Sequence, residues 1–234
     1  MKKKYKHLFF DLDNTLWDFE KNSNLAMQEV FRRFYVPSDK IDFNVFFRCY
    51  STHNHLLWES YRNKGITKKE LTRKRFQNTF DDLGIKGIDA EEMNADYLEE
   101  MPKQEKLVDG VPEVLDYLRK KRYQLFIITN GFKEVQYKKL VNTGIAGYFV
   151  KIFVSEDVKA PKPSTAIFEY AIKSSNARKS QSLMVGDDWE TDIMGAQKYG
   201  IDSAYLNNSG YKGKADIGDQ IYLLVNLYDL IKIL

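Results

Sequence analysis

Short runs of apolar residues mark the beginning of the chain and return several times in its second half. They occupy residues 8–10, 125–128, 152–154, 183–185 and 204–206. Runs of this length without alternating polar residues are typical of strands that are buried on both faces. Between the later runs, apolar residues recur at helical spacing around Val114, Ile167 and Ile193. This alternation of strand and helix predicts an α/β fold with a doubly wound parallel sheet.

The stretch between the first and second apolar runs has a different pattern, because its apolar residues recur every three or four positions throughout. The longest such series is Phe43, Phe46, Phe47, Tyr50, Leu57, Trp58 and Tyr61. Thr67 and Glu70 have the spacing of a capping box at the start of a further helix. We therefore expect two domains. Residues 1–16 and 102–234 form the α/β core, and residues 17–101 form an all-helical cap domain inserted after the first strand.

The composition is that of a globular protein of 234 residues, of which 43% are apolar and whose net charge is only +3. This near balance of charges gives no argument for a nucleic-acid partner, and we interpret the basic runs 2–4, 73–75 and 119–122 as solvated surface. No apolar run approaches the length of a membrane span, and residues 2–10 lack the pattern of a signal peptide. We expect a cytoplasmic protein without a membrane partner, and the sequence makes no prediction about oligomeric state.

The cysteine and histidine content argues against a metal site based on sulfur or imidazole. Cys49 is the single cysteine of the chain, which leaves no disulfide and no cysteine cluster for zinc. We expect it to fill space within a helix. We expect His53 and His55 to be exposed or to cap helices, because we find no partner for them at ligand spacing. His7 precedes the first strand and is expected to be structural.

Two acidic residues stand directly after the first predicted strand. Asp11 and Asp13 begin the segment Asp-Leu-Asp-Asn-Thr. In open α/β sheets, ligands bind at the carboxyl ends of the strands. A carboxylate there can act as a nucleophile towards phosphorus, and a second one can donate and accept protons. The same residues can also form a simple turn, so this segment alone leaves both interpretations open.

Three further segments carry polar groups that suit phosphoryl transfer. They are Thr129 with Asn130, Lys162 between two prolines, and Asp187 with Asp188 and Asp192. A hydroxyl or an amide can hydrogen-bond to phosphate oxygens, and a lysine can offset the charge of the phosphate and the nucleophile. The carboxylates are hard oxygen ligands that suit Mg²⁺, and Mn²⁺ could take its place. Together, the four segments favour chemistry on a phosphate ester.

In their order, and over nearly the whole chain, the four segments resemble the motifs of the haloacid dehalogenase superfamily. These motifs are Asp-x-Asp-x-Thr, a strand-end Thr, Lys-Pro followed by Ile-Phe, and Gly-Asp with a further Asp. The resemblance implies that Asp11 is the nucleophile and Asp13 the general acid and base. It also implies that Thr129 and Asn130 bind the substrate phosphate and that Lys162 stabilises both nucleophile and phosphate. The helical insert is similar to the cap that one branch of the superfamily carries between its first two motifs.

The resemblance further implies a Mg²⁺ site. The carboxylates of Asp11 and Asp187 and the backbone carbonyl of Asp13 would be its ligands, with Asp192 acting through water. The residue after the metal-binding acid is commonly Ser or Asn in relatives, whereas this chain has Asp188. Asp188 could therefore replace Asp192 in the outer shell of the metal.

Part of the cap resembles the bacterial pyrimidine 5′-nucleotidases of this superfamily, which act on nucleoside monophosphates such as dUMP, UMP and dTMP. The resemblance lies in residues 54–61, 65–67, 70–71 and 75–76. We expect the cap to select the substrate, because a lid can contribute contacts remote from the phosphate and aromatic side chains can stack against a base. Candidates are Trp17, Phe19, Tyr50 and Trp58, with Asn54 as a hydrogen-bonding partner. Most of these aromatic residues also fit a helix-bundle core, whereas Asn54 is polar on an apolar stripe and needs a partner or a substrate.

Other functions of the same fold stay open at this point. A phosphatase for phosphoglycolate or a sugar phosphate, or an enzyme like β-phosphoglucomutase, would use both acids and differ in its cap. Asp13 argues against a carbon–halogen hydrolase, because that reaction has no alkoxide leaving group that needs a proton. A non-catalytic scaffold would have no reason to keep all four segments. The sequence thus predicts a Mg²⁺-dependent phosphomonoester hydrolase acting on a small phosphorylated metabolite, with nucleoside 5′-monophosphates as the first candidates.

Overall fold

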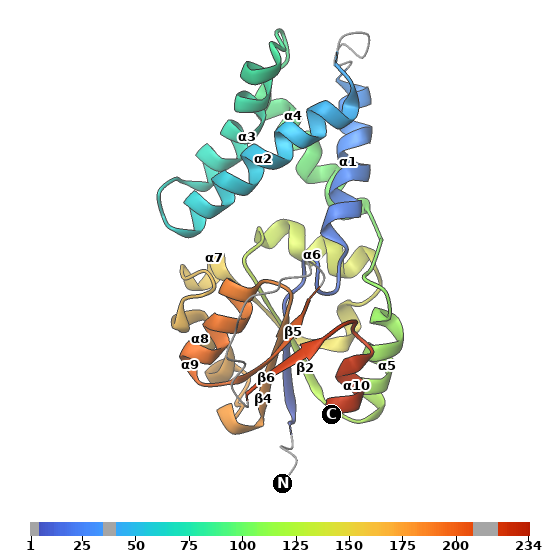
Figure 1. Cartoon of the computed structure of the whole chain (residues 1–234), viewed down its shortest axis with the longest axis vertical. Helices are drawn as coiled ribbons and strands as arrows, with labels where there is room; N and C mark the ends of the chain where they lie inside the picture. Colours follow the sequence, from blue (N-terminus) through green and yellow to red (C-terminus); the bar gives the residue numbers. More distant parts are fainter. Residues whose placement is uncertain (1–4, 35–40, 208–219) are drawn as a thin grey trace. The chain divides into compact units, whose positions relative to one another are not determined.

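The computed structural model describes residues 5–34, 41–207 and 220–234 (Figure 1). These residues form two compact units. The core unit comprises the described residues of Met1–Phe19 and Glu105–Leu234, and the helical unit comprises those of Glu20–Gln104. Within the described ranges, no helix is long and apolar enough to cross a membrane. The basic run at residues 2–4 lies outside these ranges.

The core unit is built on one six-stranded sheet in which all neighbouring strands run parallel. Its strands are β1 (His7–Phe10), β2 (Gln124–Thr129), β3 (Phe149–Val154), β4 (Ser182–Gly186), β5 (Asp202–Leu206) and β6 (Ile221–Leu224). Their order is β3-β2-β1-β4-β5-β6, so the chain moves outward in one direction from β1 to β3 and in the other from β4 to β6. This order confirms the predicted doubly wound parallel sheet. Its direction reverses between β1 and β4, where open α/β sheets bind ligands.

The sixth strand is the one that the apolar runs do not predict. β6 is a four-residue strand at the edge of the sheet, and only Leu224 among its side chains is fully buried. Apolar residues continue from it into the helix that follows, so the sequence offers no clear end to the strand. A short and half-covered edge strand has a weaker hydrophobic signature than a central one.

The register brings the ends of three strands to one edge of the sheet. Phe10, the last residue of β1, pairs with Ile127 on β2 and with Val185 on β4. The backbone amide of Asp11 then donates to the carbonyl oxygen of Val185 at 2.9 Å. Residues directly beyond these strands therefore emerge together at the carboxyl edge.

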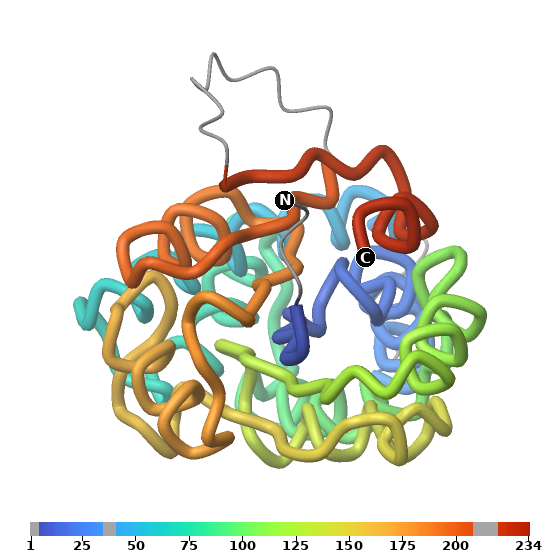
Figure 2. The backbone as a smooth tube through the Cα atoms, turned by 90° about the horizontal axis from the view of Figure 1, so that it is seen from below, coloured from blue at the N-terminus to red at the C-terminus, as the bar shows by residue number. Residues whose placement is uncertain are grey.

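Helices cover both faces of the sheet. They are α5 (Val111–Lys120), α6 (Lys133–Asn142), α7 (Ser155–Val158), α8 (Thr165–Ser174), α9 (Gly195–Tyr199) and α10 (Asp229–Ile233), with the short turns η2 (Ala146–Tyr148), η3 (Lys179–Gln181) and η4 (Trp189–Met194). α5 and α10 lie on one face, and α8 and α9 lie on the other (Figure 1, Figure 2). On the α8–α9 face, Phe9, Phe126 and Phe153 from three adjacent strands are buried, with the Phe9 and Phe126 rings stacked 4.9 Å apart. This burial of aromatic surface stabilises the sheet beneath the strand ends.

The chain leaves and re-enters the core unit through two segments that pair with each other. Trp17 forms an antiparallel bridge with Leu107. The backbone amide of Asp18 donates to the carbonyl oxygen of Lys106 at 3.0 Å. The two points of attachment of the insert are therefore held side by side by the core unit itself.

The described part of the helical unit contains four α helices. They are α1 (Phe19–Arg33), α2 (Phe43–Arg62), α3 (Lys68–Leu83) and α4 (Ala90–Glu100), followed by the short turn η1 (Met101–Lys103). The predicted capping box begins α3, where the Glu70 amide donates to Thr67 Oγ1 at 3.2 Å and the Thr67 amide donates to Glu70 Oε2 at 2.9 Å. Aromatic rings fill the centre of the unit, with the Tyr50 ring 4.9 Å from Phe76 and 5.6 Å from Tyr97.

A charged side chain is buried within this aromatic cluster, so the expectation that the whole basic run 73–75 is solvated surface is wrong for Arg75. Arg75 is 1% exposed, and its guanidinium donates to Asn94 Oδ1 from Nε at 2.9 Å and from Nη2 at 2.6 Å. Nη1 donates to Asn54 Oδ1 at 3.2 Å. The guanidinium carbon also lies 5.3 Å from the centroid of the Tyr97 ring, within cation–π range. Asn54, the polar residue on the predicted apolar stripe, thus has Arg75 as a partner.

Candidate active site

The structure gathers the polar and charged residues predicted for the site at the carboxyl edge of the sheet. They come from the segment after β1 (Asp11, Asp13), the end of β2 (Thr129, Asn130), the loop before α8 (Lys162) and the segment after β4 (Asp187, Asp188, Asp192). These segments are far apart in the sequence and meet because the strands that carry them are parallel neighbours. They surround the point where the strand order reverses.

Lys162 is the centre of the charged cluster. Its ammonium group donates to Asp11 Oδ1 and to Asp192 Oδ1, each at 2.6 Å, and the lysine is 2% exposed. A buried ammonium requires such partners, because an unpaired charge is strongly unfavourable away from water. The first ion pair places one Asp11 oxygen against a positive charge, and the second holds the ammonium group in that position.

Asn130 holds the backbone that carries Lys162. Its side-chain carbonyl accepts from the Lys162 amide at 2.8 Å, and its side-chain amide donates to the Lys162 carbonyl oxygen at 3.0 Å. Both functional groups of Asn130 are therefore engaged with the loop of Lys162. These contacts hold the loop of Lys162, and the phosphate contact expected of Asn130 stays a prediction.

The carboxylates of the cluster lie in an environment that disfavours their charge. Burial raises the pKa of Asp11 to about 7, and the negative charge of Asp192 adds to this effect against the attraction of Lys162. Burial, followed by the charge of Asp11, raises the pKa of Asp187 to about 8. Burial by itself would lower the pKa of Lys162, but the two carboxylates outweigh it and raise that pKa. The cluster therefore carries more negative charge than its one lysine offsets.

This excess of negative charge has the composition of a site for a hard divalent cation. Oxygen atoms of Asp11, Asp187 and Asp192 all lie within 4.8 Å of one another. Thr15 Oγ1 donates to Asp187 Oδ1 at 2.8 Å and orients that carboxylate. Carboxylate oxygens are the ligands that Mg²⁺ takes in proteins, and a divalent cation would offset the charge that raises the carboxyl pKa values. The residues present therefore fit Mg²⁺.

Of the two acids that follow Asp187, one lies in the cluster and the other caps a helical turn. Asp188 Oδ1 accepts from the backbone amide of Thr191 at 2.9 Å, at the start of η4. Asp192 is fully buried and bound to Lys162. A Cβ atom at Gly186 would approach Asp192 Oδ2 to 2.2 Å, so only glycine at this strand end leaves room for the carboxylate. The geometry favours Asp192 over Asp188 as the outer acid of the cluster.

Asp13 is held by two side chains of α6. Lys139 Nζ donates to Asp13 Oδ1 at 2.6 Å, and Gln136 Nε2 donates to Asp13 Oδ2 at 2.9 Å. Gln136 Nε2 also donates to Thr129 Oγ1 at 2.6 Å, which connects the segments after β1 and at the end of β2. Lys139 is 2% exposed, and its ammonium lies 4.0 Å from the centroid of the Trp17 ring. The carboxylate of Asp13 is thus fixed at both oxygens.

Gln136 and Lys139 are absent from the sequence prediction, although α6 carries a signal for them. Its buried face consists of Val135, Gln136, Lys139 and Leu140, so two polar residues share a face with two apolar ones. Polar side chains on a buried face require partners. Glycine at position 131 leaves room for the Gln136 side chain, because a Cβ atom at Gly131 would lie 2.5 Å from it.

The aromatic residues predicted to contact a base differ in accessibility. Trp17 is buried in the core unit beneath the ammonium of Lys139, and Tyr50 is buried in the aromatic cluster of the helical unit. Phe19 and Trp58 are partly exposed. Contact with a substrate stays a prediction for all four, and it is open to Phe19 and Trp58 without rearrangement of a core.

Fold and site together define a doubly wound α/β enzyme with a carboxylate–lysine cluster where its strand order reverses. The sequence pattern of the haloacid dehalogenase-like hydrolases matches residues 8–206. The chain belongs to this family, which confirms the family and the hydrolase class predicted from the sequence.

Two pyrimidine 5′-nucleotidases and one HAD-hydrolase of known structure are similar to this chain over most of its length. The pyrimidine 5′-nucleotidase PynA of Streptococcus pneumoniae is 30% identical over 204 residues, which cover 87% of this chain and 84% of that protein. The pyrimidine 5′-nucleotidase YjjG of Escherichia coli is 32% identical over 205 residues and covers 87% of each chain. The magnesium-bound crystal structure of the HAD-hydrolase YfnB of Bacillus subtilis has a TM-score of 0.87, with 28% identity and 99% of each chain covered.

Proposed function

We propose that this chain hydrolyses nucleoside 5′-monophosphates, preferring pyrimidine nucleotides, through an aspartyl phosphate on Asp11 with Mg²⁺ bound. That it is a phosphomonoester hydrolase follows from its family and from its nucleotidase relatives. The observation that carries the mechanism is the Asp11 carboxylate, buried at the strand end with one oxygen bound to Lys162 and a second acid, Asp13, two residues away.

The first half of the reaction would place the phosphoryl group on the protein. A carboxylate oxygen of Asp11 attacks phosphorus, and the bond between phosphorus and the ester oxygen breaks as the new bond forms. Asp13 gives its proton to the leaving oxygen, which departs as an alcohol. Thr129 and Lys162 offer a hydroxyl and a positive charge to the phosphate oxygens.

The second half would return the group to water. Asp13, now ionised, takes a proton from a water molecule as that water attacks the phosphorus of the aspartyl phosphate. The bond to Asp11 breaks, inorganic phosphate leaves, and both carboxyl groups regain their starting states. Lys139 and Gln136, which donate to the two oxygens of Asp13, would orient its carboxylate for this proton transfer.

Mg²⁺, when bound, would neutralise the repulsion between the Asp11 carboxylate and the phosphate dianion. Asp11, Asp187 and the backbone carbonyl of Asp13 would hold it, with Asp192 nearby in the cluster. The magnesium in the YfnB structure supports this choice of ion. Mn²⁺ takes similar oxygen ligands and could replace it.

The preference for pyrimidine nucleotides rests on the names of PynA and YjjG and on the cap segments that resemble such enzymes. We propose that the helical unit supplies the residues that select the nucleoside. Lid or cap domains contribute to rate by excluding water and by using contacts remote from the reacting phosphate. A base and a ribose offer more surface for such contacts than a small sugar phosphate does.

A substrate comparison tests this proposal. We expect kcat/KM for dUMP or dTMP to exceed that for GMP, glucose 6-phosphate and phosphoglycolate by about tenfold or more, or about 1.4 kcal/mol. A sugar phosphate or phosphoglycolate as the best substrate would overturn the nucleotide preference and leave the phosphomonoesterase chemistry. Interconversion of β-glucose 1-phosphate and glucose 6-phosphate would instead identify a mutase. Failure to release phosphate even from an aryl phosphate with Mg²⁺ would contradict the proposed reaction itself.

A further inference from the structure

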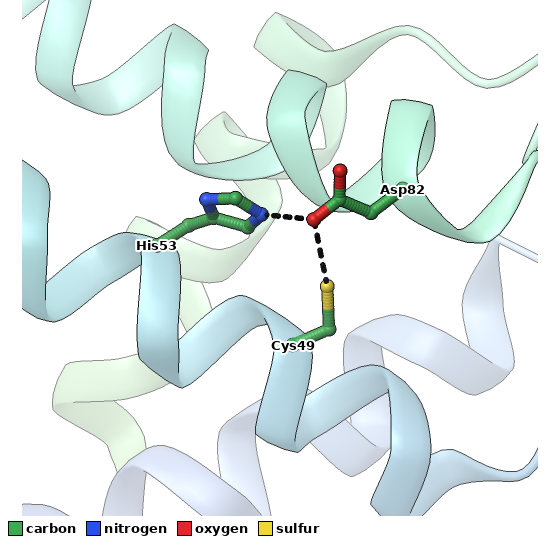
Figure 3. A group of neighbouring side chains, drawn as sticks. All are labelled: Cys49, His53 and Asp82. Atoms are coloured by element: carbon green, nitrogen blue, oxygen red, sulfur yellow. Dashed lines mark hydrogen bonds and ion pairs between the residues drawn. The ribbon is translucent and has the colours of Figure 1, made fainter.

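Three potential metal ligands meet in the helical unit, and none of them belongs to the acidic cluster of the core unit. Cys49 and His53 lie one turn apart on α2, and Asp82 lies on the neighbouring α3 (Figure 3). His53 Nε2 is 2.8 Å from Asp82 Oδ2, and Cys49 Sγ is 3.9 Å from the same oxygen. One atom from each residue lies within 4.8 Å of the other two. His53, for which we expected no ligand partner, has two in the structure.

We propose that Cys49, His53 and Asp82 form a binding site for a borderline divalent metal ion, Zn²⁺ in the first instance, that links α2 to α3. Thiolate, imidazole and carboxylate are the ligands that Zn²⁺ takes in proteins, whereas Mg²⁺ prefers oxygen ligands. The ligand set thus separates this site from the all-oxygen cluster of Asp11. Three protein ligands leave the fourth tetrahedral position for water.

The distances fit this geometry with small side-chain movements. Around a tetrahedral zinc ion, ligand atoms bonded at usual lengths lie roughly 3.4–3.6 Å apart. The two separations of 2.8 and 3.9 Å fall on either side of that value. Residues four apart on a helix present their side chains on one face, so Cys49 and His53 can reach a shared ion without distortion of α2. Metal binding would release the thiol proton to solvent.

The site is accessible from water. The side chain of Asp82 is 61% exposed and that of His53 is 20% exposed, while Cys49 is half-buried. The exposed carboxylate can turn to receive an ion, and the more buried sulfur and imidazole provide ligands with restricted motion. His55, two residues beyond His53 on α2, is exposed and outside the group, and it provides a matched control.

Co²⁺ binding to the full-length protein tests the proposal with a readout independent of catalysis. Because Cys49 is the only cysteine in the chain, a thiolate-to-cobalt charge-transfer band can arise only from this residue. We expect such a band, saturating at one cobalt per chain, that Zn²⁺ abolishes and excess Mg²⁺ does not. Cys49→Ser should remove the band. His53→Ala and Asp82→Asn should weaken cobalt binding by about tenfold or more, and His55→Ala should leave it unchanged.

Thermal unfolding in Zn²⁺ supplies a second measurement. Zn²⁺ should raise the Tm of the unmodified protein more than that of Cys49→Ser, because only the unmodified protein has the complete site. Both proteins retain the same acidic cluster, so the difference between the two shifts reports the site at Cys49. The proposal is overturned by absence of the charge-transfer band, by full binding in His53→Ala, or by saturation at one cobalt per two chains. The last outcome would show that the thiol of one chain shares its ion with another chain.

Discussion

Both units of the molecule bury cations, and Lys162 in the core unit and Arg75 in the helical unit are surrounded in different ways. In the core unit, the ammonium of Lys162 forms ion pairs with Asp11 and Asp192. In the helical unit, the guanidinium of Arg75 is bound to the side-chain carbonyls of Asn54 and Asn94 and lies among aromatic rings. Both side chains are no more than 2% exposed. One cation is thus neutralised by full charges, and the other only by dipoles and ring faces.

The difference separates a site that can respond to ligands from one that holds a structure together. Carboxylates around Lys162 remain in excess, so the core cluster favours a further cation and then a phosphate beside it. The neutral amide oxygens of Asn54 and Asn94 accept three hydrogen bonds from the Arg75 guanidinium and bring no negative charge to it. We therefore expect substitutions in the first cluster to act on catalysis and metal binding, and substitutions in the second to act on stability.

The largest expected effect is on the nucleophile. Asp11→Asn should lower kcat by about four orders of magnitude or more, the scale seen when a catalytic nucleophile is removed. The amide retains the shape of the carboxylate but cannot form an acyl phosphate at a useful rate. Activity is measured with an aryl phosphate, and circular dichroism checks that the variant is folded. Substantial turnover by the folded variant would contradict the covalent mechanism.

Removal of the metal should have the next largest effect. Exhaustive chelation should reduce activity by about a hundredfold or more, and added Mg²⁺ should restore it. Asp187→Ala should raise the Mg²⁺ concentration needed for half-maximal activity, because it removes one carboxylate of the cluster. The exposed acid Glu91 on α4 serves as a control, and Glu91→Ala should leave that concentration unchanged. Full activity in chelator would exclude a metal-dependent reaction.

Smaller effects should follow from changing Asp13 or its partner Lys139. Asp13→Asn should slow turnover by about a hundredfold, since one group serves as both acid and base. Lys139→Met should cost about tenfold, because Gln136 still holds one carboxylate oxygen. The loss should be larger for an alkyl phosphate, whose leaving group needs a proton, than for an aryl phosphate. Equal losses on both substrates would show that Lys139 does not act through Asp13.

The smallest effect on catalysis should come from the buried arginine of the helical unit. Arg75→Met should lower the free energy of unfolding by about 1–3 kcal/mol, because two buried amide oxygens lose their donors. kcat on an aryl phosphate should not change. Urea unfolding measures the first effect, and Arg73→Met, on an exposed residue two positions earlier, is the matched control. A large fall in kcat for the small aryl substrate would show that the two buried cations differ less in role than their partners suggest.

The sequence predicts the parts of this molecule that depend on local patterns. Continuous apolar runs identify five strands of the sheet, and the Thr67–Glu70 spacing identifies the start of α3. The order of polar residues at strand ends identifies the family. Strand ends are predictable because parallel neighbours must bring their carboxyl termini to a common edge.

Contacts between elements that are distant in the sequence could not be predicted from local patterns. Lys139 pairs with Asp13 across 126 positions of sequence, and the pairing depends on how α6 lies beside the segment that follows β1. Arg75 meets Asn54 and Asn94 through three separate helices of one unit. Of these residues, only Asn54 is singled out in the sequence as polar on an apolar stripe, which shows that a partner is needed but not which one.

The pairing of Trp17 with Leu107 has a consequence for how such a protein can change over generations. The core unit requires only that the two ends of an insert at this position lie side by side. A tight turn or another helical bundle can also meet this condition. A lineage could shorten, lengthen or exchange the whole insert in a single genetic event without reopening the sheet. The core would then acquire a new substrate specificity with each new insert, while Asp11 and its neighbours stay in place.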